Sequence, residues 1–487
     1  MGIVFQLLIA AILSIISVHS VFLAVLRIAK VKNLVDNPNA RKLQKNPVPV
    51  LGGIAVFFGL LIGVLTFIAV DKMILPETTM SCRSILTVLI CANVMLYIGS
   101  MDDIVGLTPT CRLLVEIFVI LAMILGTNMC IDSLHGLWGV YQFSWWIAVP
   151  LTIFTGVGLI NAYNMIDGVN GLSSGLCIAC SSMLAIVCWK RCEYVDCALA
   201  VCFAASLIPF LLHNVFGDRS RMFIGDGGTM VMGLLVSWFV IRVLSSDNAN
   251  SIESLARPNC TLGLVAMMLS IASVPVFDTL RVMTSRAAKG ISPFHADKTH
   301  LHHVFIAVGI SHSITALSEI LINVAIVAIW YISYRMGATV DTQLYIVIFA
   351  SVMLVWGMYW FLSRVVRKHP DSPTFKWAKR THLGHTKWWL ALQKVLDKGA
   401  YVDYNTVLEK KYNKDLQNMT LKEKDTAAIV NYLQGRSKVP VEDIISESGA
   451  DKLRVYPILF ELKQANVIKV IEEQALGAPK VVELNND

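Results

Sequence analysis

The chain has 487 residues, of which 55% are hydrophobic and only 15% charged, and its mean hydropathy is +0.63. Soluble globular proteins carry about 25% charged residues, so these values exclude an ordinary soluble protein. They indicate a polytopic membrane protein with a smaller soluble part. The net charge of +7 is modest and does not indicate a nucleic-acid partner. The eleven cysteines lie mostly singly within apolar stretches, so we expect small core residues rather than a disulfide framework or zinc site.

Apolar stretches of the length that crosses a bilayer, about 20 residues, recur along most of the chain. The first lacks a basic flank and a cleavage site of small residues, so we expect an uncleaved helix and not a signal peptide. We predict about eleven transmembrane helices, at 3–27, 50–70, 84–100, 113–131, 145–162, 172–189, 196–213, 228–244, 261–280, 314–334 and 343–363.

Lysine and arginine are unevenly shared between the loops. The segments after the first, ninth and eleventh predicted spans are rich in them, whereas loop 132–144 has none and loop 245–260 has only Arg257. Lys190 and Arg191 break this trend. Because basic residues favour cytoplasmic loops, we expect the N-terminus outside and the C-terminus in the cytoplasm.

The third predicted span ends in two adjacent acids, Asp102 and Asp103. Such a pair suits Mg²⁺, which prefers hard oxygen ligands and shares its shell with phosphates; the alternative is a solvated loop pair. Arg112 follows on the first turn of the fourth span. Its planar fork either closes over a phosphate or extends toward lipid headgroups.

Polar residues recur at intervals of three from Asn161 through Asn164 to Asp167, a spacing that places them on one helix face. Gly168 and Gly171 then interrupt the helix and allow a ligand to approach the backbone. The alternative is a frayed helix end rich in Asn and Gly.

Gly225-Asp226-Gly227-Gly228 directly precedes the eighth predicted span. Backbone N–H groups at a helix N-terminus favour anions, although Asp226 would alternatively be a plain N-cap. Phe223 either stacks on a nucleobase or anchors at the membrane interface.

Four of the eleven histidines lie within 295–303, together with Asp297 and Lys298. No regular fourth ligand indicates zinc. Phosphate binding or proton transfer fits better, because imidazole titrates near neutrality; an exposed His-rich loop is the alternative. With the expected orientation, all four motifs lie on the cytoplasmic face.

These motifs, in this order, resemble the polyprenyl-phosphate N-acetylhexosamine-1-phosphate transferases of glycosyltransferase family 4. Asp36-Asn-Pro38-x-x-Arg41-Lys42 and Pro47-x-Pro49-x-x-Gly52-Gly53 are similar to the first cytoplasmic loop of that family, and Pro275-x-x-Asp278-Thr279 precedes Arg286 as it does there. The resemblance covers about residues 1–365. His300-Leu-His302-His303 after Asp297 is similar to the branch that begins O-antigen (lipopolysaccharide), enterobacterial common antigen or wall teichoic acid synthesis.

The resemblance implies a reaction in the bacterial inner membrane: UDP-GlcNAc and undecaprenyl phosphate give undecaprenyl-pyrophosphoryl-GlcNAc and UMP. It implies Mg²⁺, or Mn²⁺ in its place, as cofactor, held by Asp226 and Asn164. Asp102 and Asp103 would be catalytic, preparing the lipid phosphate or supporting the metal. The implied substrate-binding residues are Arg112 at the pyrophosphate, Asp167, Asn170 and Phe223 at the uridine, Arg286, Asp297, His300, His302 and His303 at the sugar phosphate, and Arg41 and Lys42 in the first loop.

Two residues depart from the family pattern. Many bacterial relatives have Asp at the position of Asn170, so a hydrogen bond to uridine remains open there but a role as an essential base does not. The basic residue after the acid pair is usually Lys in the family and is Arg112 here, which changes the geometry of phosphate contacts.

The C-terminal part differs in composition. Residues 366–420 contain Trp377, Trp388 and Trp389 among basic residues, which predicts interfacial or linker helices. Residues 421–487 predict helices at 421–433, 441–448 and 452–465 and strands at 467–472 and 480–484, a winged-helix-like order. With nine Lys/Arg and eleven Asp/Glu, this part lacks the basic footprint of DNA binding, so we expect an unidentified protein partner.

The predicted fold class is therefore an all-α polytopic membrane protein (1–365) with a small cytoplasmic α+β domain. The same reaction with another UDP-HexNAc is one alternative. A transporter is another, but it predicts polar groups near the middle of spans and paired repeats. A membrane-anchored regulator leaves the 1–365 motifs unexplained. The predicted partners are UDP-GlcNAc, undecaprenyl phosphate and membrane lipids; a homodimer is compatible with the sequence.

Overall fold

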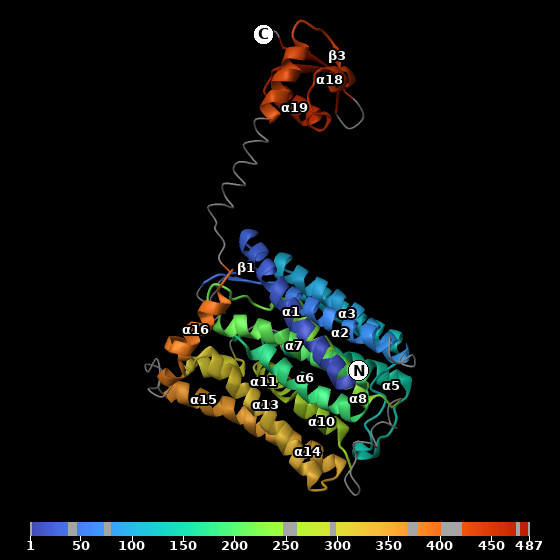
Figure 1. Ribbon diagram of the computed structural model, residues 1–487, viewed down its shortest axis with the longest axis vertical. Coiled ribbons are helices and arrows are strands. Elements are labelled where there is room, and N and C mark those ends of the chain that lie inside the picture. Colours follow the sequence, from blue (N-terminus) through green and yellow to red (C-terminus); the bar gives the residue numbers. More distant parts are fainter. Residues whose placement is uncertain are drawn as a thin grey trace. The chain divides into compact units, whose positions relative to one another are not determined.

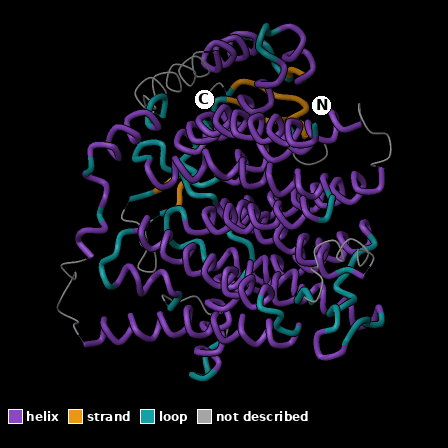
Figure 2. The backbone as a smooth tube through the Cα atoms, turned by 60° about the horizontal axis from the view of Figure 1, so that its bottom comes forward, coloured by secondary structure: helices purple, strands orange, loops and turns teal. Residues whose placement is uncertain are grey.

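The computed structural model describes residues 2–37, 46–72, 79–246, 261–292, 299–368, 378–400, 421–473 and 478–485. The chain forms two compact units, Met1–Val402 and Asp403–Asp487. Helices predominate among the described residues, as the helical segments in Figure 2 show.

Within the described residues, ten helices are long and apolar enough to cross a membrane, and a bent pair makes an eleventh crossing if it is counted as one span. This confirms the predicted polytopic helical fold (Figure 1). The ten are α1 (Ile3–Val31), α2 (Gly52–Lys72), α3 (Thr79–Val105), α4 (Pro109–Thr127), α5 (Trp145–Met165), α6 (Leu172–Lys190), α7 (Tyr194–Phe216), α8 (Gly225–Leu244), α13 (His312–Arg335), and α14 (Val340–Ser351) continued by η4 (Val352–Trp356) and α15 (Gly357–Lys368).

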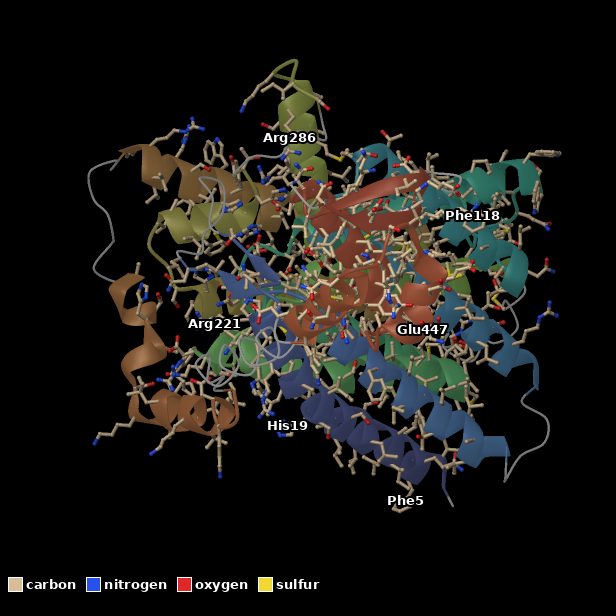
Figure 3. The ribbon with its side chains drawn as sticks, turned by 90° about the horizontal axis from the view of Figure 1, so that it is seen from above. Phe5, His19, Phe118, Arg221, Arg286 and Glu447 are labelled. Carbon is tan, nitrogen blue, oxygen red and sulfur yellow. The ribbon has the colours of Figure 1, made fainter. Side chains whose placement is uncertain are left out.

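Helix α8 is the centre of this bundle, because nearly all of its residues are buried between other helices. Helix α1 lies at the rim, where Phe5 is 49% exposed, and Phe118 of α4 is 68% exposed. Figure 3 labels both side chains on outlying helices. Large apolar side chains exposed on the outer helices fit a surface covered by lipid.

The bent pair consists of α10 (Leu264–Ile271) and α11 (Ser273–Ala287), which meet at an angle of 78°. The span predicted over 261–280 is therefore bent, and it counts as one crossing only if the two helices are taken together. Asn323 of α13 stabilises the break, because its Oδ1 accepts from the backbone N–H of Val274 (3.1 Å) and its Nδ2 donates to the carbonyl of Ile271 (2.9 Å). Within a membrane such freed backbone groups need internal partners.

The spanning helices alternate in direction, so their polar connections gather at the two ends of the bundle. At one end, α1, α3, α5, α7 and α11 finish and α2, α4, α6, α8 and α13 begin; we call this the polar end. It also holds α12 (Leu301–Ala307) and the strand pair β1 (Val35–Asp36) and β2 (Val48–Pro49). At the other end, the described connection between α4 and α5 contains the short helix η1 (Leu137–Gly139).

A C-terminal segment of the first unit, residues 378–400, is bound across the polar end; we call it the strap. It contains η5 (Ala378–Thr381), η6 (Leu383–His385) and α16 (Lys387–Leu396). The Asp397 carboxylate accepts from the backbone N–H of Ser220 (2.8 Å), and Arg27 Nη2 donates to the carbonyl of Gly399 (2.8 Å). The Trp389 ring lies 4.5 Å from that of Phe216.

The second unit has its own apolar core, formed by residues such as Ile429, Leu459 and Val482. Its helix 421–433 is followed by β3 (Val439–Pro440), α18 (Val441–Glu447), α19 (Lys452–Gln464), β4 (Ile468–Glu473) and β5 (Pro479–Leu484). The predicted helices and hairpin are confirmed. Strand β3 was not predicted; it pairs with β5 in an antiparallel sheet of order β3-β5-β4.

Candidate active site

Arg112, in the first turn of α4, contacts four polar side chains at the polar end. Its Nη1 contacts Asp102 Oδ2 at 3.1 Å and Asp226 Oδ2 at 3.4 Å. Its Nη2 donates to Asn164 Oδ1 at 2.8 Å, and its Nε contacts Glu116 Oε1 at 3.4 Å. One guanidinium thus joins α3, α5 and α8 to its own helix.

Asn164 is held in one orientation by the groups around it. While its Oδ1 accepts from Arg112, its Nδ2 donates to Asp226 Oδ1 (2.9 Å) and Thr229 Oγ1 (2.7 Å). The side chain of Asp226 remains 37% exposed. The cluster is therefore rigid on its protein side and open to a ligand on the other.

The predicted single face of Asn161, Asn164 and Asp167 is not found. Helix α5 ends at Met165, so Asp167 lies beyond it in the loop to α6. The amide of Asn161 donates to Glu116 Oε2 (2.5 Å). Of the three, only Asn164 contacts Arg112 directly, and Asn161 is linked to it through Glu116.

Asp103 binds the N-terminus of α8. Its Oδ1 accepts from the backbone N–H of Asp226 (3.1 Å), and its Oδ2 from that of Gly227 (3.5 Å). A carboxylate at a helix N-terminus is favourable because it meets free N–H groups and the positive end of the dipole. Asp226 itself is not the N-cap; Ile224 takes that position, and the glycine-rich motif forms the first turn of α8 rather than preceding it.

The glycines of this motif serve close helix packing. A Cβ on Gly53 of α2 would lie 2.5 Å from the Cα of Gly228, and a Cβ on Gly99 of α3 would overlap the Cα of Gly227. The backbones of α2, α3 and α8 therefore touch at the first turn of α8, which carries Asp226. This packing role differs from the predicted role in anion binding.

The segment 47–53, which resembles part of the first cytoplasmic loop of the family, contacts this same turn. The N–H of Phe223 donates to the Pro49 carbonyl (2.8 Å), and the N–H of Gly52 donates to the Phe223 carbonyl (2.9 Å). The N–H of Gly53 donates to the carbonyl of Ile224 (2.8 Å). These bonds hold the backbone on both sides of Phe223, whose side chain is half-buried.

The loop between α5 and α6 carries Asp167 and the half-buried Asn170. Asp167 Oδ1 accepts from Ser173 Oγ (2.6 Å). Although Asp167 is an exposed residue, the protein around its carboxyl partly desolvates it and raises its pKa to about 6; the Ser173 hydrogen bond opposes this rise and Asp226 adds to it. Asn214 ties the loop down by accepting from the N–H of Gly171 (2.7 Å).

The histidine segment packs against that loop. A Cβ on Gly168 would overlap the ring of His302, so the two touch directly. The His300 and His302 rings are stacked at 5.6 Å, and His302 and His303 lie 4.4 Å apart. Burial, with the neighbouring histidines, holds the pKa of His302 well below its usual value, which favours a neutral ring.

Four other predicted residues remain to be placed. Arg286 is buried near the end of α11, on the helix labelled at the edge of Figure 3. Arg41, Lys42 and Asp297 fall outside the described residues.

Comparison with known proteins shows that the chain is similar to members of one family. The pattern of Glycosyl transferase family 4 matches residues 85–244, which include Asp102, Arg112, Asn164 and Asp226. The chain is 28% identical over 360 residues to the undecaprenyl-phosphate alpha-N-acetylglucosaminyl 1-phosphate transferase of Escherichia coli (strain K12), covering 70% of this chain and 90% of that protein. It is 30% identical over 298 residues to the protein of that name from Yersinia pestis, covering 59% of this chain and 74% of that protein.

The chain belongs to glycosyl transferase family 4. A probable undecaprenyl-phosphate N-acetylglucosaminyl 1-phosphate transferase of Bacillus subtilis (strain 168) is also similar, at 29% identity over 319 residues, 65% of this chain and 82% of that protein. The chain is thus a multi-pass membrane enzyme of the phospho-HexNAc transferase type.

In this family 4 enzyme, the residues around Arg112 fit a divalent cation. Mg²⁺ is commonly held by one or two carboxylates, with waters and substrate phosphates completing its shell. Asp226 and Asn164 supply hard oxygens on adjacent helices, and Asp102 supplies a third. Within the described residues, no three His, Cys, Asp or Glu side chains are grouped as ligands, so phosphates or water would have to complete the shell.

Several residues that build the candidate site were not among the predicted ones. Glu116 is buried in α4 and joins Arg112 to Asn161; an acid within an apolar span, four residues after an arginine, was a signal that could have found it. Thr229 and Asn214 act by contacts between helices. Nothing in their local sequence could have indicated those contacts.

Proposed function

We propose that this family 4 enzyme transfers GlcNAc-1-phosphate from UDP-GlcNAc to undecaprenyl phosphate, giving undecaprenyl-pyrophosphoryl-GlcNAc and UMP. The observation that carries the proposal is the joining of Asp102, Asn164 and Asp226 through Arg112 at one end of the bundle. A transporter would instead need polar groups near the middle of the spans. The names of the similar bacterial proteins support the choice of donor and acceptor.

In the proposed reaction, an oxygen of the lipid phosphate bonds to the β-phosphorus of the donor. The bond from that phosphorus to the bridging oxygen breaks, and UMP leaves. Both substrates are anions, so their approach is repulsive unless cations offset it. When bound by Asp226 and Asn164, Mg²⁺, or Mn²⁺ in its place, would supply Lewis-acid polarisation and charge neutralisation of the diphosphate.

The protein's own groups orient the reactants. Arg112 places a fixed positive charge beside Asp226, where a diphosphate would approach, and its planar fork suits phosphate oxygens. Asp102, held by Arg112 and by the N–H of Leu107 (2.7 Å), borders the same space and would prepare the lipid phosphate. Asp103 would act indirectly, by fixing the start of α8 and thus Asp226.

The remaining predicted residues take the other parts of the donor. Asp167, Asn170 and Phe223 would receive the uridine, and the histidine segment 300–303, with Asp297 and Arg286, the sugar phosphate. Arg41 and Lys42 would attract the lipid phosphate. The excess of Lys and Arg in the connections at the polar end supports a cytoplasmic site in the bacterial inner membrane, where a soluble nucleotide meets a lipid headgroup.

The test is UMP release by purified protein in detergent. We expect release only when UDP-GlcNAc, undecaprenyl phosphate and Mg²⁺ are all present, and less with UDP-GalNAc as donor. Faster turnover of UDP-GalNAc would assign another UDP-HexNAc. Release of UMP without the lipid phosphate would contradict transfer to a lipid acceptor.

A further inference from the structure

Asp278, on α11, is a buried carboxylate engaged by the start of the histidine segment. Its Oδ2 lies 2.8 Å from His300 Nδ1. The backbone N–H of Leu301, the first residue of α12, donates to both of its oxygens, at 3.1 and 3.3 Å. The carboxylate therefore holds an imidazole ring and the backbone beside it at the same time.

Arg281, one turn along α11, locks this carboxylate in place. Its Nη2 and Nε donate to Asp278 Oδ1 at 2.7 and 3.2 Å, and Nη2 also donates to the Thr299 carbonyl (2.5 Å). Its guanidinium lies 3.5 Å from the centre of the Tyr359 ring on α15. Trp356, in the π-helical turn that precedes α15, donates to the Phe277 carbonyl (2.9 Å) and so fixes α11 itself.

The contact has a chemical consequence for His300. With Nδ1–H donated to a carboxylate, the ring orientation is fixed and Nε2 is the nitrogen left to meet another group. The ring stacks on His302, which touches Gly168 in the loop that carries Asp167. The setting of His300 is thereby passed to the residues around the proposed donor site.

We propose that Asp278 is a positioning residue of the transfer reaction, acting through His300 to set the tautomer and direction of the histidine segment. This rests on the proposed role of that segment at the sugar phosphate. Asp278 itself would not touch substrate, because its side chain is only 1% exposed and both oxygens are already engaged. The bend at Ala272 would then direct α11 so that Asp278 meets the histidine segment.

The bundle also contains a comparable buried carboxylate that pairs with an arginine. Asp196 of α7 is equally buried and accepts from Arg242 Nε and Trp238 Nε1, each at 3.1 Å. It lies in the first turn of α7, at the end opposite the polar end. Asp196→Asn therefore controls for loss of a buried carboxylate that pairs with arginine.

The experiment compares Asp278→Asn with Asp196→Asn in the UMP release assay. In Asp278→Asn an amide N–H₂ opposes the Nδ1–H of His300, so we expect kcat to fall about 10- to 100-fold, as when an outer partner of a functional histidine is removed. KM for the donor should stay within about threefold, since uniform binding is not lost. Asp196→Asn should keep kcat within about twofold, because a remote pair acts on stability alone.

A double variant tests the route through His300. If Asp278 acts through that ring, Asp278→Asn combined with His300→Gln should be no slower than His300→Gln alone. Multiplying losses, or a kcat for Asp278→Asn equal to that of Asp196→Asn, would overturn the proposal. Should Asp278→Asn fail to fold, Asp278→Glu keeps the charge for Arg281 but moves the carboxylate from His300, and the same loss of kcat is expected.

The wild-type protein separates this inference from the proposed function. If wild type releases no UMP from UDP-GlcNAc, the proposed donor is wrong, and the Asp278 comparison is made with whichever UDP-HexNAc it does consume. If wild type is active and Asp278→Asn is equally active, only the positioning role of Asp278 fails.

Discussion

Arg112 makes contacts in two directions that the single ammonium group of a lysine would not make with the same geometry. A guanidinium donates in several directions within one plane, whereas an ammonium is a compact point charge. Arg112 uses this geometry to contact Asp102 and Asp226 through one nitrogen and Asn164 through another. Removing it would leave two carboxylates close together without compensation, and like charges disfavour each other's ionisation.

Asp167 gives a prediction for pH. Its folded pKa of about 6 lies above the usual value near 3.9, so the carboxyl is mostly ionised above neutrality and gains a proton as the pH falls through about 6. If ionised Asp167 accepts a hydrogen bond from uridine, KM for UDP-GlcNAc should rise below about pH 6. Steady-state kinetics from pH 5 to 8 measure this.

The control is Asp167→Asn, which cannot titrate. Its KM should be higher than that of wild type at pH 8 and nearly flat across the same range. The acceptor phosphate also titrates in this window, but it affects both proteins equally. An identical pH profile for the two would show that Asp167 does not govern donor binding. The free energy of unfolding depends on pH in the opposite direction. Because the pKa of Asp167 is higher in the folded protein than in the unfolded chain, its contribution to stability is lost as the pH rises from about 4 to 6.

At this scale, the sequence could indicate the residue types of the site, because charged and amide groups at the ends of apolar spans are unusual. It could not indicate that Asp103 would bind the N-terminus of α8, or that Glu116 would support Arg112. Those contacts depend on how α3, α4, α5 and α8 pack, which local sequence does not specify.

Among the elements, α8 packs very closely against two of its neighbours. Its first turn touches α2 and α3 at glycines, and the same turn carries Asp226. Ordinary side chains would hold helix axes 8–10 Å apart, and the small-residue contacts allow a closer approach. The position of Asp226 is therefore set partly by residues that have no polar group.

Two glycine variants separate packing from helix propensity. Replacing either Gly99 of α3 or Gly158 of α5 by Ala gains about 1 kcal/mol of helix propensity. Gly99→Ala should nevertheless lower both thermal stability and UMP release, because the new Cβ overlaps the Cα of Gly227. Gly158→Ala in α5 meets no atom within 4 Å and should leave both unchanged or slightly raise stability.

Melting in detergent, followed by size-exclusion chromatography, and the UMP assay report the two effects. Equal behaviour of the two variants would mean that the contact between α3 and α8 does not control the site.

The spans themselves could be predicted from hydropathy. The break at Ala272 could not, since its stabilising partner Asn323 lies on α13, far along the chain.

At the scale of the whole molecule, the transferase and the C-terminal unit are separate in structure. The second unit, Asp403–Asp487, has its own core, while the strap belongs to the first unit. The match to the Escherichia coli relative covers 70% of this chain, so the rest of the chain lies outside that match. The order of helices and strands in the C-terminal unit could be predicted from periodicity, but its partner could not.

Two truncations distinguish the strap from that unit. Ending the chain at residue 400 should leave UMP release in detergent unchanged, because the strap and its contacts remain. Ending it at residue 377 removes the bonds from Asp397 to Ser220 and from Arg27 to Gly399, each contributing about 1 kcal/mol. We expect that shorter protein to melt at a lower temperature and to lose activity; equal stability of the two would contradict a bracing role for the strap.

The most direct test of the account follows the β-phosphate of the donor. With UDP-GlcNAc labelled with ³²P at that position, wild-type protein, Mg²⁺ and undecaprenyl phosphate should carry the label into the lipid fraction as UMP appears. Asp226→Ala, which removes a proposed metal ligand beside Arg112, should fold but transfer no label. Label that stays in the aqueous phase with wild type, or transfer that persists in folded Asp226→Ala, would contradict phosphosugar transfer at this site.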